Sequence, residues 1–133
     1  MIAGVLDTHA ALWYMLRNPR LSVRARQFVD DAGVIGDDVL VSSISLADVV
    51  YLVEKGRLPA SAYDELRDAL ANPAYAIREA PLNNEIVAAM RNIARAEVPD
   101  MPDRIVAATA VYFGVPVVSR DGRIRAANLR TIW

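Results

Sequence analysis

The sequence contains no cysteine, and this absence excludes both a disulfide framework and a thiolate metal site. It also lacks a long hydrophobic run, because the longest nearly continuous one, residues 105–118, is too short to span a membrane and is broken by Gly114 and Pro116. No basic stretch precedes the apolar amino-terminal run, which Asp7 interrupts, so an export signal is not expected. Together these absences predict a cytoplasmic protein.

Lysine and histidine each occur only once, as Lys55 and His9, and the net charge of −1 creates no general attraction to nucleic acids. All other basic side chains are arginines, whose planar guanidinium groups can bind phosphate through two parallel hydrogen bonds. A genomic preference for arginine codons would produce the same imbalance. The composition therefore leaves nucleic-acid binding open.

The 133 residues match the length of one domain, which buries roughly two-thirds of its unfolded surface. Hydrophobic residues make up 54% of the chain, and the 23% of charged residues are spread along its whole length, which argues against a disordered or fibrous protein. No repeat, linker or low-complexity segment divides the sequence. We therefore expect residues 1–133 to form a single domain.

Short apolar runs typical of strands alternate with longer segments of helical periodicity. Because strands separated by helices pair in parallel through right-handed crossovers, this order predicts a three-layer α/β/α domain. Its centre is expected to be a parallel sheet of four to five strands. Strands are predicted over residues 2–6, 39–41, 76–80, 115–119 and 131–133, and helices over residues 10–16, 22–31, 45–55, 61–71, 83–96 and 103–113.

Two aspartates follow predicted strands directly. Asp7 comes after the first strand and Asp121 after the strand at 115–119. In open parallel sheets, ligands bind outside the carboxyl ends of the strands, so these two acids are expected to lie near a shared site. Each also has a local structural explanation, because Asp7 can cap the next helix and Asp121 can form a turn with Gly122.

Two further aspartates stand near helix starts. Asp48 comes three residues after Ser45, which is the spacing of a capping box. Asp103 follows Pro102, at a position where proline fits the first helical turn and a negative charge is favoured. Periodicity does not say from which edge of the sheet the helix of Asp103 starts, because two helices in succession precede it.

Several carboxylates crowded at one edge of a sheet would repel one another and raise each other's pKa unless a cation neutralised them. Magnesium and manganese are the natural candidates, because hard divalent cations prefer oxygen ligands and need only a few protein carboxylates besides water and substrate phosphate. Such an ion can activate water for attack on phosphorus. The acids therefore indicate a metal site for phosphodiester hydrolysis.

Four motifs in the right order resemble those of a known family, the PIN domain, and within it the VapC-type toxins of bacterial toxin–antitoxin systems. The resemblance covers most of the chain, at residues 6–13, at 41–48 continuing to 56–58, at 100–110 and at 117–121, with Ile124 where a hydrophobic residue usually follows. It implies a metal-dependent endoribonuclease that hydrolyses RNA with a metal-activated water. It also implies that Asp103 joins Asp7, Asp48 and Asp121 around Mg²⁺ or Mn²⁺.

The same resemblance implies two protein partners. One is a second copy of the chain, with the helices between residues 45 and 71 as candidates for the homodimer contact. The other is a small cognate antitoxin that inserts a segment near the acidic pocket.

The sequence departs from the family at Asp48, where glutamate is usual. The shorter side chain could reach a metal directly or through water, or it could weaken the site. The alternative function is accordingly a catalytically impaired PIN-fold module that binds protein or RNA. Asp100, three residues before Asp103, is either an outer metal ligand or a loop acid.

Other polar residues could support the four acids. The hydroxyls of Thr8 and Ser119 could hydrogen-bond to ligating carboxylates. Arg120, Arg123 and Arg125 flank Asp121 and could hold the RNA backbone, or they could form a solvated surface.

His9 lies four residues before Trp13, on the same helical face, which favours packing between them or a contact with substrate. It also argues against a hydrolase of the phosphoaspartate type, which normally carries a second acid two residues after the first. A signalling receiver domain needs a lysine near its last strands, whereas Lys55 lies in the middle of the chain.

Overall fold

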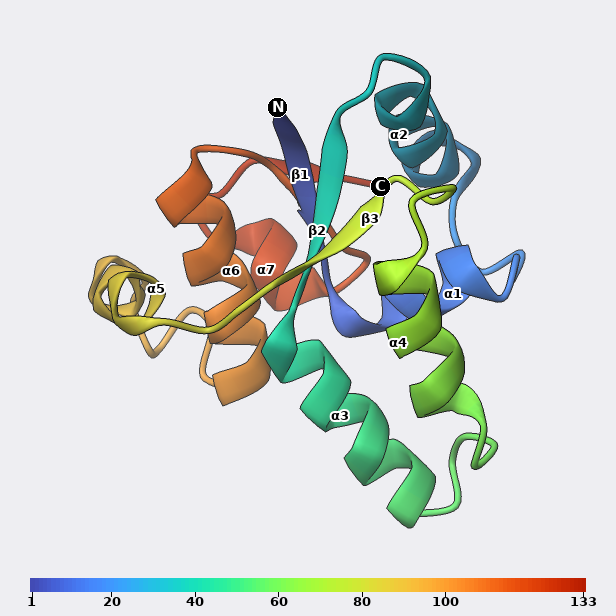
Figure 1. Ribbon diagram of the computed structural model, residues 1–133. Coiled ribbons are helices and arrows are strands. Elements are labelled where there is room, and N and C mark those ends of the chain that lie inside the picture. The colour runs from blue at the N-terminus through green and yellow to red at the C-terminus, as the bar shows by residue number, and fades with distance from the viewer.

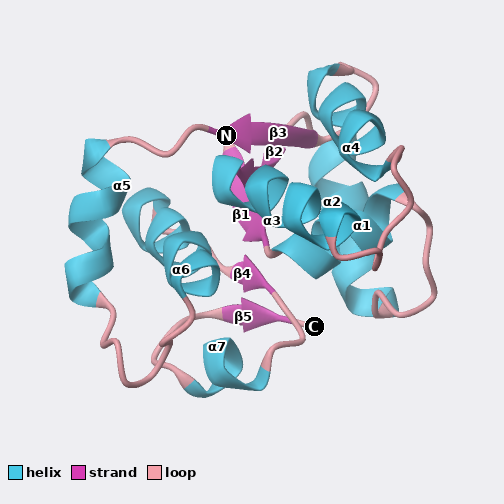
Figure 2. Ribbon diagram, turned by 90° about the horizontal axis from the view of Figure 1, so that it is seen from below, coloured by secondary structure: helices cyan, strands magenta, loops and turns pink.

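All five strands run parallel, in the order β3-β2-β1-β4-β5, as the computed structural model of residues 1–133 shows. Helices cover both faces of this sheet, with α5, α6 and α7 on one side and α1, α2 and α4 on the other (Figures 1 and 2). The strands are β1 (Ile2–Leu6), β2 (Asp38–Ser42), β3 (Ile77–Ala80), β4 (Val117–Val118) and β5 (Thr131–Ile132). The helices are α1 (Thr8–Met15), α2 (Val23–Val34), α3 (Ser43–Glu54), α4 (Ala62–Ala71), α5 (Asn84–Ala89), the 3₁₀ turn η1 (Met90–Asn92), α6 (Met101–Phe113) and α7 (Gly122–Ala126).

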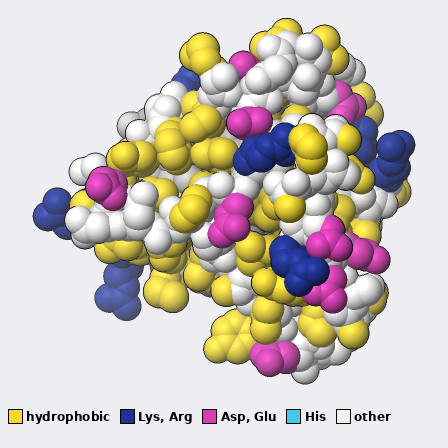
Figure 3. Space-filling view, in the orientation of Figure 1, with side chains coloured by type: hydrophobic (Ala, Val, Ile, Leu, Met, Phe, Trp, Pro, Cys, Tyr) yellow, Lys and Arg dark blue, Asp and Glu magenta, His cyan; other side chains and the backbone are white.

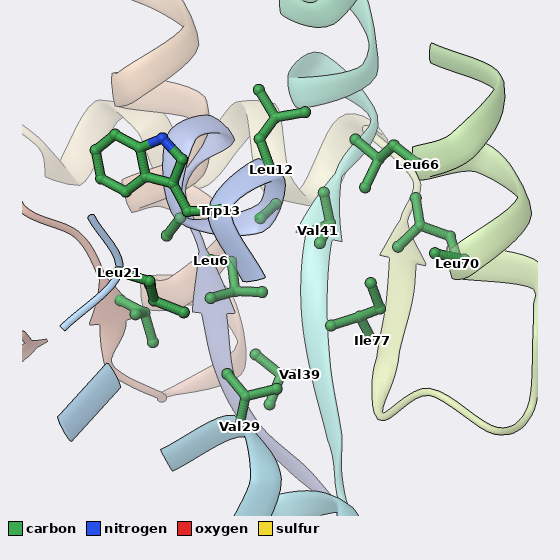
Figure 4. Close-up of a cluster of buried hydrophobic side chains, with 14 of the residues drawn as sticks. Leu6, Leu12, Trp13, Leu21, Val29, Val39, Val41, Leu66, Leu70 and Ile77 are labelled. Carbon is green, nitrogen blue, oxygen red and sulfur yellow. The ribbon is translucent and has the colours of Figure 1, made fainter. Parts of the chain in front are cut away.

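Successive strand residues point into two separate cores, because side chains alternate between the faces of a strand. Leu6 and Val41 pack with residues of α1, α2 and α4 in one cluster, which Figure 4 shows. Their neighbours Val5 and Leu40 pack with residues of α5, α6 and α7 in the other. The sheet is therefore covered on both faces, and the predicted three-layer α/β/α architecture with a parallel sheet is confirmed.

The helix predicted over residues 83–96 is too long. Helix α5 ends at Ala89, and the 3₁₀ turn η1 follows it before the chain becomes extended at Ile93. The side chain of Arg104, in α6, donates hydrogen bonds to the carbonyl oxygens of Met90 (2.9 Å) and Ile93 (3.2 Å). The carbonyl oxygens at this helix end thus have a hydrogen-bond donor from a distant element, so the helix need not continue.

Two predicted helices begin earlier than expected, and one further helix was not predicted. Helix α3 begins at Ser43 with Ser42 as its N-cap, so the predicted capping box of Ser45 with Asp48 is wrong. Helix α6 begins at Met101, and Asp100 is its N-cap. Helix α7 was not predicted, and the local interpretation of Asp121 as a simple turn residue is replaced by its role as the N-cap of this helix.

Basic and acidic side chains lie dispersed among hydrophobic ones on the face of the molecule seen in Figure 3. On α4, for example, Arg67 forms ion pairs with the exposed Asp64 (3.2 Å) and Asp68 (3.1 Å). None of the helices combines the length and the hydrophobicity that crossing a membrane would require.

Candidate active site

Five aspartates from four parts of the chain line one open pocket of about 560 Å³. Asp7 follows β1, Asp48 lies in α3, and Asp121 follows β4. Asp100 and Asp103 lie at the start of α6. The structure thus brings together all four predicted site acids, and Asp100, for which the sequence left an outer ligand or a loop acid open, lines the same pocket.

Asp7 is buried, with 7% of its surface exposed. One carboxylate oxygen, Oδ1, accepts a hydrogen bond from the backbone N–H of Ala10 (2.8 Å), so Asp7 is a helix cap as its position predicted. The other, Oδ2, accepts a hydrogen bond from the Ser119 hydroxyl (2.5 Å). Burial raises the pKa of Asp7 above its ordinary value, although both hydrogen bonds act in the opposite direction.

Ser119 connects two of the acids. Besides donating to Asp7, its hydroxyl oxygen accepts a hydrogen bond from the backbone N–H of Asp121 (3.0 Å). Ser119 is completely buried, directly after β4. It therefore ties the acid after β1 to the chain segment after β4.

Asp48 receives a comparable contact from Thr8. The Thr8 hydroxyl donates to Asp48 Oδ2 (2.9 Å), and its oxygen lies 3.0 Å from the Ser45 hydroxyl oxygen. Burial is the largest influence on the pKa of Asp48 and raises it, and the charge of Asp100 raises it further, against the lowering effect of the Thr8 hydrogen bond. Thr8 thus links the start of α1 to Ser45 and Asp48 in α3.

Asp103 shows how closely the acids are gathered. Burial raises its pKa to about 7, followed in importance by the negative charges of Asp100, Asp121, Asp7 and Asp48. Each of these charges disfavours ionisation of Asp103. Five carboxylates and three basic side chains line the pocket, which leaves an excess of two negative charges when every carboxyl group is ionised and His9 is neutral.

This donor set fits a hydrated magnesium or manganese ion. The potential ligands are carboxylate oxygens, which hard divalent cations prefer, and an ion of charge +2 would balance the excess negative charge. No three carboxyl groups lie close enough together to hold a metal through protein atoms alone. Mg²⁺ does not require such a cage, because it retains several waters and needs only one or two carboxylates.

Replacing Thr8 with valine should weaken Mn²⁺ binding by about 10-fold to 100-fold, the usual effect of removing a group that orients a metal ligand. Valine keeps the shape of threonine but leaves the Asp48 carboxylate without its hydroxyl donor. Isothermal titration of the purified protein with Mn²⁺ measures this change. Thr8→Ser retains the hydroxyl and should restore the affinity, whereas unaltered Mn²⁺ affinity in Thr8→Val would contradict the orienting role.

Basic and aromatic side chains complete the lining of the pocket. They include Arg120, which was predicted, and three residues that were not: Arg20, Tyr51 and Lys55. The predicted residues Arg123 and Arg125 lie in α7 and do not line the pocket.

Helical spacing would have identified two of the missed residues. Tyr51, in α3, and Lys55, the C-cap residue of α3, lie three and seven positions after Asp48, on the same helical face. Arg20 has no comparable signal, because it follows the turn at Pro19 and only the tertiary structure places it beside the pocket. His9 is exposed, and its ring lies 5.6 Å from that of Trp13, so it both packs on Trp13 and faces the pocket.

Known proteins resemble this chain in sequence or in fold. Ribonuclease VapC22 of Mycobacterium tuberculosis (strain ATCC 25618 / H37Rv) is 27% identical over 126 residues, covering 95% of this chain and 92% of the relative. A chain in the crystal structure of VapBC2 from Rickettsia felis, bound to a DNA fragment from the VapBC2 promoter, matches this chain with a TM-score of 0.68 and 16% sequence identity. The match covers 98% of this chain and 97% of that chain. A toxin–antitoxin complex from Klebsiella pneumoniae matches with a TM-score of 0.64 and 17% identity, over 93% and 91%.

At such identities the two solved structures support the fold alone. The family itself follows from the sequence, because residues 4–128 match the family model described as PIN domain. This match contains each of the five aspartates of the pocket. The chain belongs to the PIN domain family.

Proposed function

We propose that this protein is a metal-dependent endoribonuclease and the toxin of a toxin–antitoxin pair. The observation that carries the proposal is the gathering of five carboxylates from separate elements around one open pocket. Negatively charged side chains at this density are costly unless a cation compensates them. The likeness to a relative named as a ribonuclease supports RNA as the substrate.

In this proposal Asp7, Asp48, Asp103 and Asp121 hold Mg²⁺ or Mn²⁺, in part through water, with Asp100 as an outer ligand. A bound ion of this kind supplies activation of water and stabilisation of the departing oxygen in phosphodiester hydrolysis.

The chain's own residues orient the acids. Ser119 fixes one oxygen of Asp7, and the N–H of Ala10 fixes the other. Thr8 fixes one oxygen of Asp48. With their rotamers restrained in this way, the carboxylates need little rearrangement when they bind an ion.

Two protein partners belong to the proposal. The likeness to a toxin–antitoxin complex supports a small cognate antitoxin. A homodimer would cover apolar surface that α3 leaves exposed outside the pocket, such as Val50, which is 40% exposed. We also propose that residues 1–133 act as one domain in the cytoplasm.

The second candidate function is an impaired PIN module that binds RNA or protein without cutting RNA. Asp48 favours it, because this aspartate stands where the family usually has the longer glutamate. The same structure shows that no three carboxyl groups converge on one point. In that case, RNA cleavage depends on whether Asp48 can bind the metal ion through a bridging water.

RNA cleavage by the purified chain decides between these functions. We expect end-labelled RNA, both single-stranded and structured, to be cut when Mn²⁺ or Mg²⁺ is supplied, and fluorescence anisotropy would report binding of the same RNA. Binding without cleavage of any RNA would favour the impaired module. A purified chain that neither binds nor cuts any of these RNAs would contradict the proposed ribonuclease.

A further inference from the structure

Two chemically different sets of side chains line the acidic pocket. Besides the five carboxylates, three basic residues contribute to its lining, namely Arg20, Lys55 and Arg120. Opposite charges within one pocket would ordinarily form ion pairs, because the attraction grows as the charges approach. Whether these three cations pair with the acids therefore decides what they are available to bind.

None of the three basic side chains has a carboxylate partner. The ion pairs of the protein, defined by an N···O distance of up to 4.0 Å, involve only the N-terminal amine, Arg67 and Arg78. Arginine side chains that donate hydrogen bonds within the protein are Arg26, Arg67, Arg78, Arg91, Arg104 and Arg130. Arg20 and Arg120 are absent from both groups, so their N–H donors remain free for an anion.

Aromatic rings restrain two of these cations in place of carboxylates. The guanidinium carbon of Arg120 lies 4.8 Å from the centre of the Trp13 ring, and the Lys55 ammonium lies 5.8 Å from that of Tyr51. A cation–π contact holds a cation without using its N–H donors. Arg120 is therefore restrained and still able to form a bidentate contact with phosphate.

Trp13 provides a firmer support than Tyr51 does. Its side chain is only 8% exposed, whereas Tyr51 is 65% exposed. Figure 4 shows the Trp13 ring at the margin of the buried cluster, away from Leu66 and Leu70. The rings of His9 and Trp133 lie 5.6 and 6.0 Å from it. Because Trp13 is anchored in this way, Arg120 is the cation of the pocket whose position is best defined.

We propose that Arg120, positioned by Trp13, binds a backbone phosphate of single-stranded RNA adjacent to the phosphodiester that is cut. Arg120 lines the same pocket as the five aspartates, so a phosphate bound to its guanidinium lies beside the acidic cluster. Arg20 and Lys55 extend the same basic lining. Phosphate contacts of this kind fix the register of a strand and contribute no base specificity. The inference rests on the proposed ribonuclease function and names how that site holds its substrate.

The salt dependence of RNA binding tests this assignment. Fluorescein-labelled oligouridylate is titrated with protein at several KCl concentrations, with Ca²⁺ replacing Mg²⁺ to suppress cleavage, and anisotropy gives the dissociation constant. Arg120→Ala should weaken binding about tenfold and reduce the slope of log K against log salt by about 0.7, the value for one phosphate contact on a single strand. Arg120→Lys keeps the charge and should keep the slope, with an affinity between the two.

Arg24→Ala is the matched control. Arg24 is an exposed arginine of α2 that lies outside the acidic pocket, so this substitution removes the same charge without touching the site. It should leave both the affinity and the slope nearly unaltered. If Arg120→Ala behaves like Arg24→Ala while the wild type binds and cuts RNA, the inference is wrong and the ribonuclease function stands. If the wild type neither binds nor cuts RNA, the proposed function fails as well.

The positioning role of Trp13 requires a double-mutant cycle. Trp13→Leu should lower RNA affinity because Arg120 loses its support, and adding Trp13→Leu to Arg120→Ala should cause little further loss. A merely structural role would instead make the two losses additive in free energy. Trp13→Phe preserves an aromatic face and should recover most of the affinity. Equal loss of affinity for a labelled polyglutamate peptide would show only general charge attraction and would overturn the assignment to RNA.

Discussion

Asp7→Asn is expected to lower RNA cleavage by about 10³-fold, the effect of removing one well-placed electrostatic group from an active site. Asparagine has the shape of aspartate and can still accept the hydrogen bond from Ala10 through its carbonyl oxygen. Its amide group can donate to the Ser119 hydroxyl, which at present donates to Asp7. The substitution therefore removes the negative charge and leaves the local structure intact.

The stability of the variant separates loss of function from loss of fold. Burial raises the pKa of Asp7, which means that the folded state disfavours the charged carboxylate. A neutral amide should therefore leave the thermal midpoint of unfolding equal to that of the wild type or higher. Asp68→Asn, an exposed acid of α4 outside the pocket, is the matched control and should cut RNA normally. Undiminished cleavage by folded Asp7→Asn would remove Asp7 from the mechanism.

Removal of divalent metal with EDTA is expected to abolish cleavage, and Mn²⁺ or Mg²⁺ should restore it. The carboxylates of the pocket have no other counterion of sufficient charge, because the basic residues beside them form no ion pairs with them. Cleavage that persists in EDTA, after dialysis to remove bound metal, would contradict a metal-dependent reaction.

The metal-free protein should also gain stability when the pH falls from about 8 to about 5.5. The pKa of Asp103 is raised to about 7 in the folded protein, above its ordinary value of 3.8, so between these values the folded state binds more protons than the unfolded state. Stability consequently falls as the pH rises through 7. The raised pKa values of Asp7 and Asp48 act in the same direction.

After allowance for the partial exposure of Asp103, we expect a gain of about 1 kcal/mol in the free energy of unfolding. Urea unfolding in EDTA at the two pH values measures it. Saturating Mn²⁺ should reverse the trend, because metal binding requires ionised carboxylates and becomes tighter as the pH rises. Asp103→Asn should flatten the profile without metal, and an unaltered profile in this variant would show that other groups determine it.

Much of the fold was predictable because its causes are local. The strand from Ile2 to Leu6 is apolar throughout, and Asp7 directly after it starts α1 as an N-cap. Where prediction failed, a distant residue was responsible: Arg104 satisfies carbonyl groups of Met90 and Ile93, so the helix predicted to reach residue 96 ends earlier. Helix α7 escaped prediction because its five residues are too few to show helical periodicity.

The candidate site, too, could be predicted from the sequence only in part. Asp7 and Asp121 could be placed at one edge of the sheet because each follows a strand, and the alternation of strands with helices makes those strands parallel. The position of Asp103 relative to them could not be derived from the residues alone. Its helix directly follows another helix, and periodicity does not show from which edge of the sheet the second of two successive helices starts. Family resemblance supplied that assignment, and the structure places the start of α6 at the same pocket.

By itself, the sequence determined the class of fold, the order along the chain of the strands and of every α-helix except α7, and the acids available to a metal, because these depend on neighbouring residues and on hydrophobic periodicity. The tertiary structure alone decided how those acids affect one another. The pKa of Asp103 rises to about 7 because burial and four other carboxylates act on it together. It also decided that the guanidinium group of Arg120 packs on the ring of Trp13, which lies far away in the sequence. The N–H donors of Arg120 remain free in this position. Burial and charge interactions depend on distances in space, which only the folded chain sets.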